Sequence, residues 1–305
     1  MTYSLTSNKG KFYRGNLHTH TTRSDGIMPI EDCVAYYKSL GYDFLAITDH
    51  RRYYAGGDIG GMLLLDGLEN DISYDIGYHK CHHFVGIGSG TADPYIHEET
   101  HTSPSQIKEG TQAQGLIDEM RRKCELIIHA HPLWSNTEWE DYGSLAGCDM
   151  VEVYNTGCDV LDSNGIATSA WQIMLSKGMK IYACATDDGH RDCDVGGGWV
   201  EVCSPSLTQT NIIAAIKRGQ FYATTGPQLR EMTFEDGVLS VECSPVKRIN
   251  FITSTNQLRN KAIYANDHAG MLTKGSYRID FGTAFVRVEL TDFAGKVAWS
   301  QPIFF

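Results

Sequence analysis

The 305-residue sequence predicts an α/β fold in which an irregular, TIM-like β/α barrel of seven strands precedes a small antiparallel β-sandwich. From residue 16 to about 203, short apolar runs of strand length alternate with segments of helix length, and this alternation predicts a parallel barrel. In the tail, apolar and polar residues alternate with a period of two, which predicts antiparallel strands. We therefore expect the barrel to span residues 1–224 and the sandwich residues 225–305.

Seven apolar runs are candidates for the strands of the barrel. In chain order they read NLHTH, DFLAITDH, MLLLDGLE, HHFVGIG, ELIIHAHP, DMVEVYN and KIYACATDDGH. Between several of them lie helix-length segments at residues 29–40, 105–123 and 162–177, and the first of these opens with a proline and is followed by a glycine. The connection at residues 51–61 is too short and too rich in glycine for a full helix, so we expect an irregular barrel.

The C-terminal part begins with one more helix, which the segment SLTQTNIIAAIKRGQ predicts. The strands expected after it lie in FYATTG, REMTFEDGVLSVEC, RINFITSTN, SYRIDF, AFVRVELTD and KVAWSQPIFF. Asp236 and Gly237 predict a turn inside the second of these segments. The sequence shows no low-complexity linker, so we expect the sandwich to pack closely on the barrel.

Charge and cysteine usage narrow the function classes. With 26 basic and 37 acidic residues the formal charge is −11, which disfavours binding to nucleic acid polymers and to anionic membranes. The nine cysteines are scattered without a CxxC pair, which argues against a disulfide framework or a structural zinc knuckle. The sequence shows no signal-peptide core and no apolar run long enough to span a bilayer. We therefore expect a cytoplasmic protein that acts on a small molecule, and its oligomeric state does not follow from the sequence.

Nine potential metal ligands fall at the ends of the predicted strands or close to them. They are His18, His20, Asp25, His50, Glu69, His83, His131, Asp188 and His190. The carboxyl ends of barrel strands converge on one mouth, so residues distant in the sequence are expected to face one another there. Side chains two residues apart on a strand share a face, which allows His18 and His20 to point inward together.

Imidazole and carboxylate groups together are good ligands for Zn, Mn or Fe. Nine such groups exceed what a single ion takes, so we expect two or three divalent metal ions, bridged by a carboxylate such as Glu69 or Asp188. A single histidine at a strand end is more often solvated or hydrogen-bonded than a ligand. The joint placement at several strand ends nevertheless favours the multi-metal interpretation.

Six segments resemble the successive motifs of the PHP (polymerase and histidinol phosphatase) superfamily: NLHTHTTRSDG, AITDH, GLE, HHFVG, AHP and DDGH. The resemblance covers residues 16 to about 203 and implies a distorted seven-stranded β/α barrel with a trinuclear metal centre. It implies three groups of ligands, which are His18, His20, Glu69 and Asp188 for one ion, Glu69, His83 and His131 for a second, and Asp25, His50 and His190 for a third. Asp25 stands where many relatives have a histidine. The segments AAIKRGQFYATTGP and VAWSQPIFF also resemble the C-terminal region of a subgroup that includes carbaryl hydrolase-like proteins.

Candidate residues for catalysis and substrate binding follow from the same segments. We assign Glu69, Asp188 and His190 to the catalytic set. Arg51 and Arg191 directly follow metal motifs, where a guanidinium would bind a phosphate with two hydrogen bonds. Arginines in such flanking positions are usually just solvated, so that alternative stays open. Asn155, at the end of the sixth predicted strand, is a weaker candidate for substrate binding.

Together these features predict a hydrolase, namely a metal-dependent phosphoesterase that acts on a small phosphorylated molecule of the nucleotide or sugar phosphate type. A metal-bound water would supply the hydroxide that attacks phosphorus, and no Ser-His-Asp or Cys-His arrangement is evident. The same metal ligands would also serve hydrolysis of an ester, an amide or a carbamate. A non-enzymatic protein whose sandwich binds a sugar or a partner is the alternative from another class.

Overall fold

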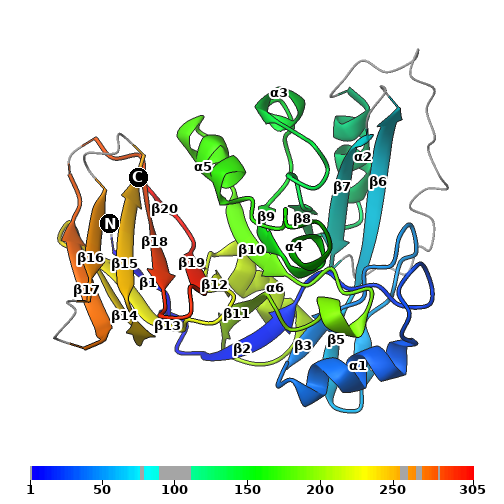
Figure 1. The fold of residues 1–305 in the computed structure, drawn as a ribbon, viewed down its shortest axis with the longest axis horizontal. Coiled ribbons are helices and arrows are strands. Elements are labelled where there is room, and N and C mark those ends of the chain that lie inside the picture. The colour runs from blue at the N-terminus through cyan, green and yellow to red at the C-terminus, as the bar shows by residue number, and fades with distance from the viewer. Residues whose placement is uncertain (1, 76–78, 89–110, 255–259, 266–269, 281) are drawn as a thin grey trace.

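A computed structural model describes the chain except for residues 1, 76–78, 89–110, 255–259, 266–269 and 281. The described residues form three β-sheets and six α-helices, so the fold belongs to the mixed α/β class that the sequence predicts (Figure 1). The helices are α1 (Ile30–Ser39), α2 (Thr111–Arg121), α3 (Trp139–Tyr142), α4 (Thr156–Asp162), α5 (Thr168–Ser176) and α6 (Gln209–Lys217). In this described part of the chain, no helix is long and apolar enough to cross a membrane.

One sheet has five strands in the order β10-β9-β8-β7-β6. Its strands are β6 (Gly67–Asp75), β7 (His79–Ile87), β8 (Leu126–His129), β9 (Met150–Asn155) and β10 (Tyr182–Thr186). β8, β9 and β10 run parallel to one another, but β7 is antiparallel to both β6 and β8. The parallel arrangement predicted for all barrel strands is therefore wrong at β6 and β7, which form a long hairpin beside α2 (Figure 1).

The largest sheet has eleven strands and runs through most of the molecule. In sheet order its strands are β16 (Lys261–Tyr264), β15 (Arg248–Thr253), β18 (Phe285–Thr291), β19 (Val297–Ser300), β12 (Phe221–Thr224), β11 (Trp199–Ser204), β2 (Lys11–Asn16), β3 (Phe44–Ala46), β5 (Met62–Leu65) and β4 (Gly57–Ile59), and β20 (Ile303–Phe304) pairs with β18. The sequence does not predict β4, β11 or β16. β11 matters most, because it pairs with both β2 and β12 and so joins N-terminal strands to C-terminal ones.

The segment MLLLDGLE, predicted as one strand, forms two. β5 lies in the large sheet beside β3, and β6 begins after Asp66 in the five-stranded sheet. A Cβ atom on Gly67 would lie 2.7 Å from the carbonyl oxygen of Ile47, which explains why glycine occupies this crossing point. Glu69 therefore lies near the start of a new strand and not at the end of the predicted one.

Two isolated β-bridges connect these sheets where several strands end. Thr19 pairs with Gly189 and thereby links the segment after β2 to the segment after β10. His50 pairs with Glu69 and links the segment after β3 to β6. The bridges bring together four chain segments that contain predicted metal ligands.

The helices follow the sequence signals in part. α1 begins directly after Pro29, as expected, and Gly41 follows it with a φ of 83°. The helix predicted for residues 162–177 corresponds to α5, which begins later, at Thr168. The sequence does not predict α4, which ends at Asp162, before Ser163 takes a left-handed conformation with a φ of 55°. The helix predicted for residues 105–123 corresponds to α2, and its residues 105–110 lie outside the described residues.

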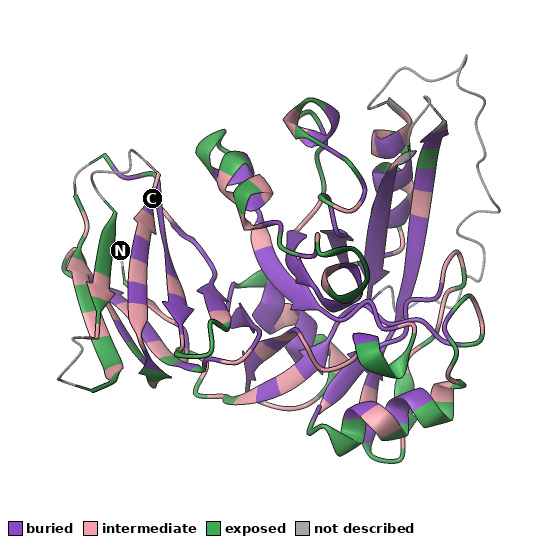
Figure 2. Ribbon diagram, in the orientation of Figure 1, coloured by how far each residue is buried: buried purple, intermediate pink, exposed green. Residues whose placement is uncertain are grey.

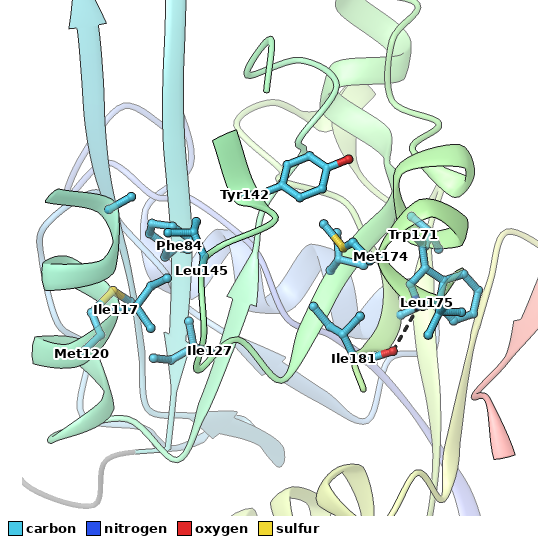
Figure 3. Close-up of a cluster of buried hydrophobic side chains, with 14 of the residues drawn as sticks. Phe84, Ile117, Met120, Ile127, Tyr142, Leu145, Trp171, Met174, Leu175 and Ile181 are labelled. Carbon is cyan, nitrogen blue, oxygen red and sulfur yellow. Dashed lines mark hydrogen bonds between the residues drawn. The ribbon is translucent and has the colours of Figure 1, made fainter. Parts of the chain in front are cut away.

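Apolar side chains fill both faces of the five-stranded sheet, and buried residues dominate the centre of the molecule (Figure 2). On one face Phe84 and Ile127 pack under α2 and α5, and Figure 3 shows this layer. On the other face the neighbouring residues Val85 and Ile128 pack against strands of the large sheet. The indole N–H of Trp171 donates to the carbonyl oxygen of Ile181 over 3.1 Å and fixes α5 on this layer (Figure 3). Burial on both faces explains why these strands are short runs of apolar residues.

The third sheet is antiparallel and has four strands, which are β1 (Tyr3–Ser4), β13 (Leu229–Glu235), β14 (Val238–Val246) and β17 (Leu272–Arg278). Asp236 and Gly237 connect β13 to β14 with φ angles of 48° and 76°, so the predicted turn is confirmed. An apolar cluster lies between this sheet and the C-terminal strands of the large sheet, and it includes Met232, Phe251 and Val288.

Arg287 connects this C-terminal region to the helix layer. Its side chain is 2% exposed, forms an ion pair of 2.5 Å with Glu289 and donates two hydrogen bonds to Gln172 of α5. The guanidinium also lies 4.4 Å from the ring centre of Trp171. A buried cation with these partners ties β18 to α5.

We expect Arg287→Met to lower the free energy of unfolding by about 3 kcal/mol, because Glu289 would keep a poorly hydrated charge without its partner. Urea denaturation measures this change. The matched control is Lys274→Met, which removes an exposed ion pair with Glu242 and should cost less than about 1 kcal/mol. Equal effects of the two substitutions would contradict a connecting role for Arg287.

Candidate metal centre

The first two histidines lie in the segment that follows β2. Their side chains are fully buried, and their Nε2 atoms lie 3.1 Å apart. The backbone N–H of His18 donates to the side chain of Asn16, and that of His20 donates to the carbonyl oxygen of Gly189. The predicted strand NLHTH thus ends at Asn16, and these backbone contacts aim both rings at one point.

Two carboxylates face that point. Oε2 of Glu69 lies 3.3 Å from Nε2 of His18 and 3.2 Å from Nε2 of His20. Oδ1 of Asp188 lies 3.2 Å and 3.1 Å from the same two nitrogens. Four side chains predicted to hold one ion therefore converge.

The other oxygen of Glu69 faces a second pair of histidines. Its Oε1 lies 2.8 Å from Nδ1 of His83 and 3.5 Å from Nε2 of His131. His83 lies inside the antiparallel strand β7, and His131 follows β8 with an unusual φ of 24°. The two oxygens of Glu69 thus face two different pairs of histidines, so Glu69 would contribute to both ligand groups if metal ions were bound.

A third group lies nearest to solvent. Asp25, whose side chain is 54% exposed, lies 3.4 Å from His190, 3.6 Å from His50 and 3.5 Å from His20. Ring nitrogens and carboxylate oxygens of these four residues lie within 4.8 Å of one another. All nine residues that the sequence predicts as metal ligands are therefore brought together.

The donor set fits divalent cations. Among the described residues, neither Oε2 of Glu69 nor Nδ1 of His50 has a hydrogen-bond partner, although both atoms are buried and lie 3.1 Å apart. The Nδ1 atom of His190 donates to the carbonyl oxygen of Asp188, since a carbonyl can only accept, and this leaves a lone pair on Nε2 toward Asp25. Lone pairs that face carboxylates across a shared space are what a bound cation requires.

The charges of the cluster are strongly coupled. Burial alone would lower the pKa of His20, but the adjacent Asp188 and Glu69 carboxylates raise it to about 9. Burial would raise the pKa of Glu69, but the surrounding histidines hold it well below its usual range. The carboxylates of Glu69 and Asp188 are therefore ionised. Buried negative charges are stable only beside positive charge, which metal ions or protons on the histidines would supply.

The sequence-based prediction misses Glu152, a buried residue of β9. Its Oε1 accepts hydrogen bonds from Nδ1 of His18 over 2.7 Å and from the hydroxyl of Thr186 over 2.7 Å. Its Oε2 accepts from the backbone N–H of His131 and from the side chain of Asn155. The one signal in the sequence is a charged residue in the middle of MVEVY, whose other residues are apolar or aromatic.

Two more histidines lie close in sequence to predicted ligands but face away from them. His82 and His129 lie with ring nitrogens 3.4 Å apart, between Tyr74, Phe84 and Tyr142 on the helix side of the sheet. Strand alternation sends His82 and His83 to opposite faces. His83 is therefore the neighbour that reaches the cluster, as expected, and His129 is a core residue.

Seven of the nine clustered residues line a cavity of about 420 Å³, and His18 and His20 lie buried behind them. The three predicted substrate-binding residues differ in whether they reach this cavity. Arg191 lines it. Arg51 forms an ion pair of 2.6 Å with Asp71 on β6. Asn155 is fully buried, donates to Glu152 and Asp188, and accepts the backbone N–H of Cys158 at the start of α4. Asn155 is thus placed to orient carboxylates, and Arg191 is the substrate-binding candidate that the geometry favours.

Comparisons with known proteins bear on the fold. No protein-family model matches the sequence, and no curated protein does. The structure is similar to that of a two-domain protein from Bacteroides vulgatus that contains a predicted PHP-like metal-dependent phosphoesterase, with a TM-score of 0.51, 14% sequence identity and coverage of 93% of this chain and 92% of the other. A lesion-specific endonuclease, EndoQ from Pyrococcus furiosus, matches with a TM-score of 0.42 and 13% identity over 68% of this chain and 56% of its own. The resemblance to PHP proteins that the motifs indicate is thus confirmed at the level of the fold.

Proposed function

We propose that this chain, which shares its fold with a PHP-like metal-dependent phosphoesterase, is itself a metal-dependent hydrolase of small phosphate esters. The observation that carries the proposal is the position of Glu69. Its two carboxylate oxygens face separate sets of histidines, an arrangement that would suit a ligand shared by two ions.

The residues present would hold two or three divalent ions, such as Zn, Mn or Fe. The proposed ligand groups are those that the resemblance implies: His18, His20, Glu69 and Asp188; Glu69, His83 and His131; and Asp25, His50 and His190. When bound, such ions polarise a phosphoryl oxygen and lower the pKa of a water molecule, which is the chemistry that hydrolysis needs. Asp25 is the most exposed ligand, so we expect the third ion to be held most weakly.

The chain's own residues prepare this site in specific ways. Glu152 accepts a hydrogen bond from the Nδ1–H group of His18. The Nε2 atom of His18 therefore presents a lone pair to the cluster. Asn155 holds Glu152 and Asp188 at a fixed distance from each other through one amide group. Arg191, on the cavity wall, is placed to bind a phosphate oxygen.

The cavity and the charge of the chain favour a small substrate. A volume of about 420 Å³ suits a small molecule, and the net charge of −11 disfavours a nucleic acid polymer. A second candidate reaction is hydrolysis of an ester, amide or carbamate at the same metal ligands. It is favoured by the apolar side chains Ile27, Trp134 and Leu161 around the cavity.

The test is inorganic phosphate release by protein loaded with Mn²⁺ or Zn²⁺, measured over a panel of small phosphate monoesters. We expect release from at least one ester and its loss on chelation. The same samples are assayed with carboxylic esters and carbamates. Hydrolysis of these alone, with metal bound, would favour the second reaction, and no hydrolysis of either class would contradict both.

We also propose the finer architecture that the sequence predicts. The strands that carry the cluster would form the distorted seven-stranded barrel of residues 1–224, and the two packed C-terminal layers would form the β-sandwich of residues 225–305. The bridges Thr19–Gly189 and His50–Glu69, and the apolar cluster around Phe251, support this division. The large sheet runs across position 224, so the two parts are expected to unfold together in one transition.

A further inference from the structure

Part of the cavity wall consists of apolar side chains and no metal ligand. Ile27, Trp134, Cys158 and Leu161 form this part, which we call the apolar wall. Ile27 and Leu161 are 62% and 52% exposed. Large apolar side chains grouped at the edge of a polar centre indicate a site for an apolar ligand group, because they gain burial only when it binds.

Trp134 is held rigidly within this wall. Its indole N–H donates to a carboxylate oxygen of Asp162 at the end of α4 over 2.9 Å. Its ring lies edge-on to His131 and His83, with centroid distances of 5.0 Å and 5.7 Å. The indole is thus fixed beside two of the proposed ligands, where an organic group attached to a bound phosphate would lie.

The charges around the cavity limit the substrate to few anionic groups. Among the described residues that line it, Arg191 carries the only permanent positive charge. The carboxylate of Asp162, which is not a proposed metal ligand, lines the same cavity. One guanidinium suits a single phosphate group, and a second phosphate or a sugar acid near Trp134 would meet the carboxylate of Asp162.

We propose that the substrate is a phosphate monoester of an alcohol that carries an apolar aromatic ring. The ring would pack against Trp134 and Leu161. This inference rests on the proposed phosphoesterase function and narrows its substrate class away from nucleotides and sugar phosphates. In the reaction a water oxygen bonds to phosphorus and the bond from phosphorus to the alcohol oxygen breaks. One proton of the water ends on the released alcohol and the other on the phosphate.

The experiment compares benzyl phosphate with glucose 6-phosphate, since both are esters of primary alcohols and differ mainly in the polarity of the organic group. We expect the wild-type protein to prefer benzyl phosphate by roughly tenfold or more in kcat/KM. Trp134→Ala should lower kcat/KM for benzyl phosphate by roughly tenfold, mainly through KM, and change that for glucose 6-phosphate by less than about twofold. Bound metal, measured by elemental analysis, should stay unchanged.

Val160→Ala is the matched control, because Val160 lies beside Leu161 on α4, is 52% exposed and is not among the cavity-lining residues. It should leave both substrates unaffected. If the Trp134 variant does not fold, Leu161→Ala takes its place, with the same expected selective loss.

Equal use of both esters by the wild type, or equal loss of both in the variants, would overturn the inference and leave the proposed phosphoesterase function intact. Absence of phosphate release from every ester by metal-loaded protein would instead remove the proposed function, and the inference with it. The two failures are therefore distinguishable.

Discussion

Glu69→Gln is expected to release bound metal and to lower the rate of phosphate release by roughly a thousandfold, equivalent to about 4 kcal/mol of lost transition-state stabilisation. Glutamine keeps the size of the side chain but loses its negative charge and replaces one oxygen by a donor. The substituted carboxylate lies close to ring nitrogens of five histidines: His18, His20, His50, His83 and His131. The proposed ligand groups of two ions therefore lose a shared member at once.

Elemental analysis and the phosphate assay are made on the same preparation of this variant. Glu242→Gln serves as control, because that carboxylate is exposed and pairs only at the surface with Lys274. The control should keep its metal and its rate. A Glu69→Gln protein that retains full metal content and full activity would show that the cluster is not the catalytic centre.

Glu152→Gln is expected to weaken metal binding by roughly 10- to 100-fold without removing any proposed ligand. The carboxylate fixes the ring of His18 through Nδ1 and the backbone of His131 through its N–H. The neutral amide would hold His18 less strongly and would reduce the negative charge that favours a cation. Competition with a chelator of known affinity measures the change.

Glu201→Gln is the matched control for this substitution. Glu201 lies on β11, is half-buried, and accepts a hydrogen bond from the Trp199 indole, which is not part of the cluster. It should leave metal affinity unchanged. A Glu152 variant with wild-type metal affinity but a lower unfolding midpoint would assign Glu152 a purely structural role.

The sequence correctly predicted that nine candidate ligands lie close together, but it placed several of the strands that position them incorrectly. The two histidines of HTH lie after β2, and Glu69 lies near the start of β6, yet both reach the same point. The prediction of the ligands does not depend on exact strand boundaries. The β-bridges at Thr19 and His50 join the segments that contain the ligands, and these bridges set the positions of the ligands.

What the sequence could not supply depends on pairing between distant segments. An apolar run such as HHFVGIG is the same whether its neighbours are parallel or antiparallel, so the β6–β7 hairpin was not predicted. Glu152 has no motif around it, and its role appears only when His18 and His131 are placed beside it. Arg51 and Arg191 look alike in sequence. Only the structure shows that both pair with an aspartate, Asp71 and Asp194, and that of the two Arg191 lines the cavity.

The proposed function requires that this cluster hydrolyse phosphate esters with the help of bound divalent ions. The most direct measurement titrates chelator-treated protein with Mn²⁺ and records bound metal and phosphate release on the same samples. We expect no release without metal, and release that rises as ions fill the sites shared by Glu69. Undiminished release from metal-free protein, or filled sites with no hydrolysis of any ester, would contradict it.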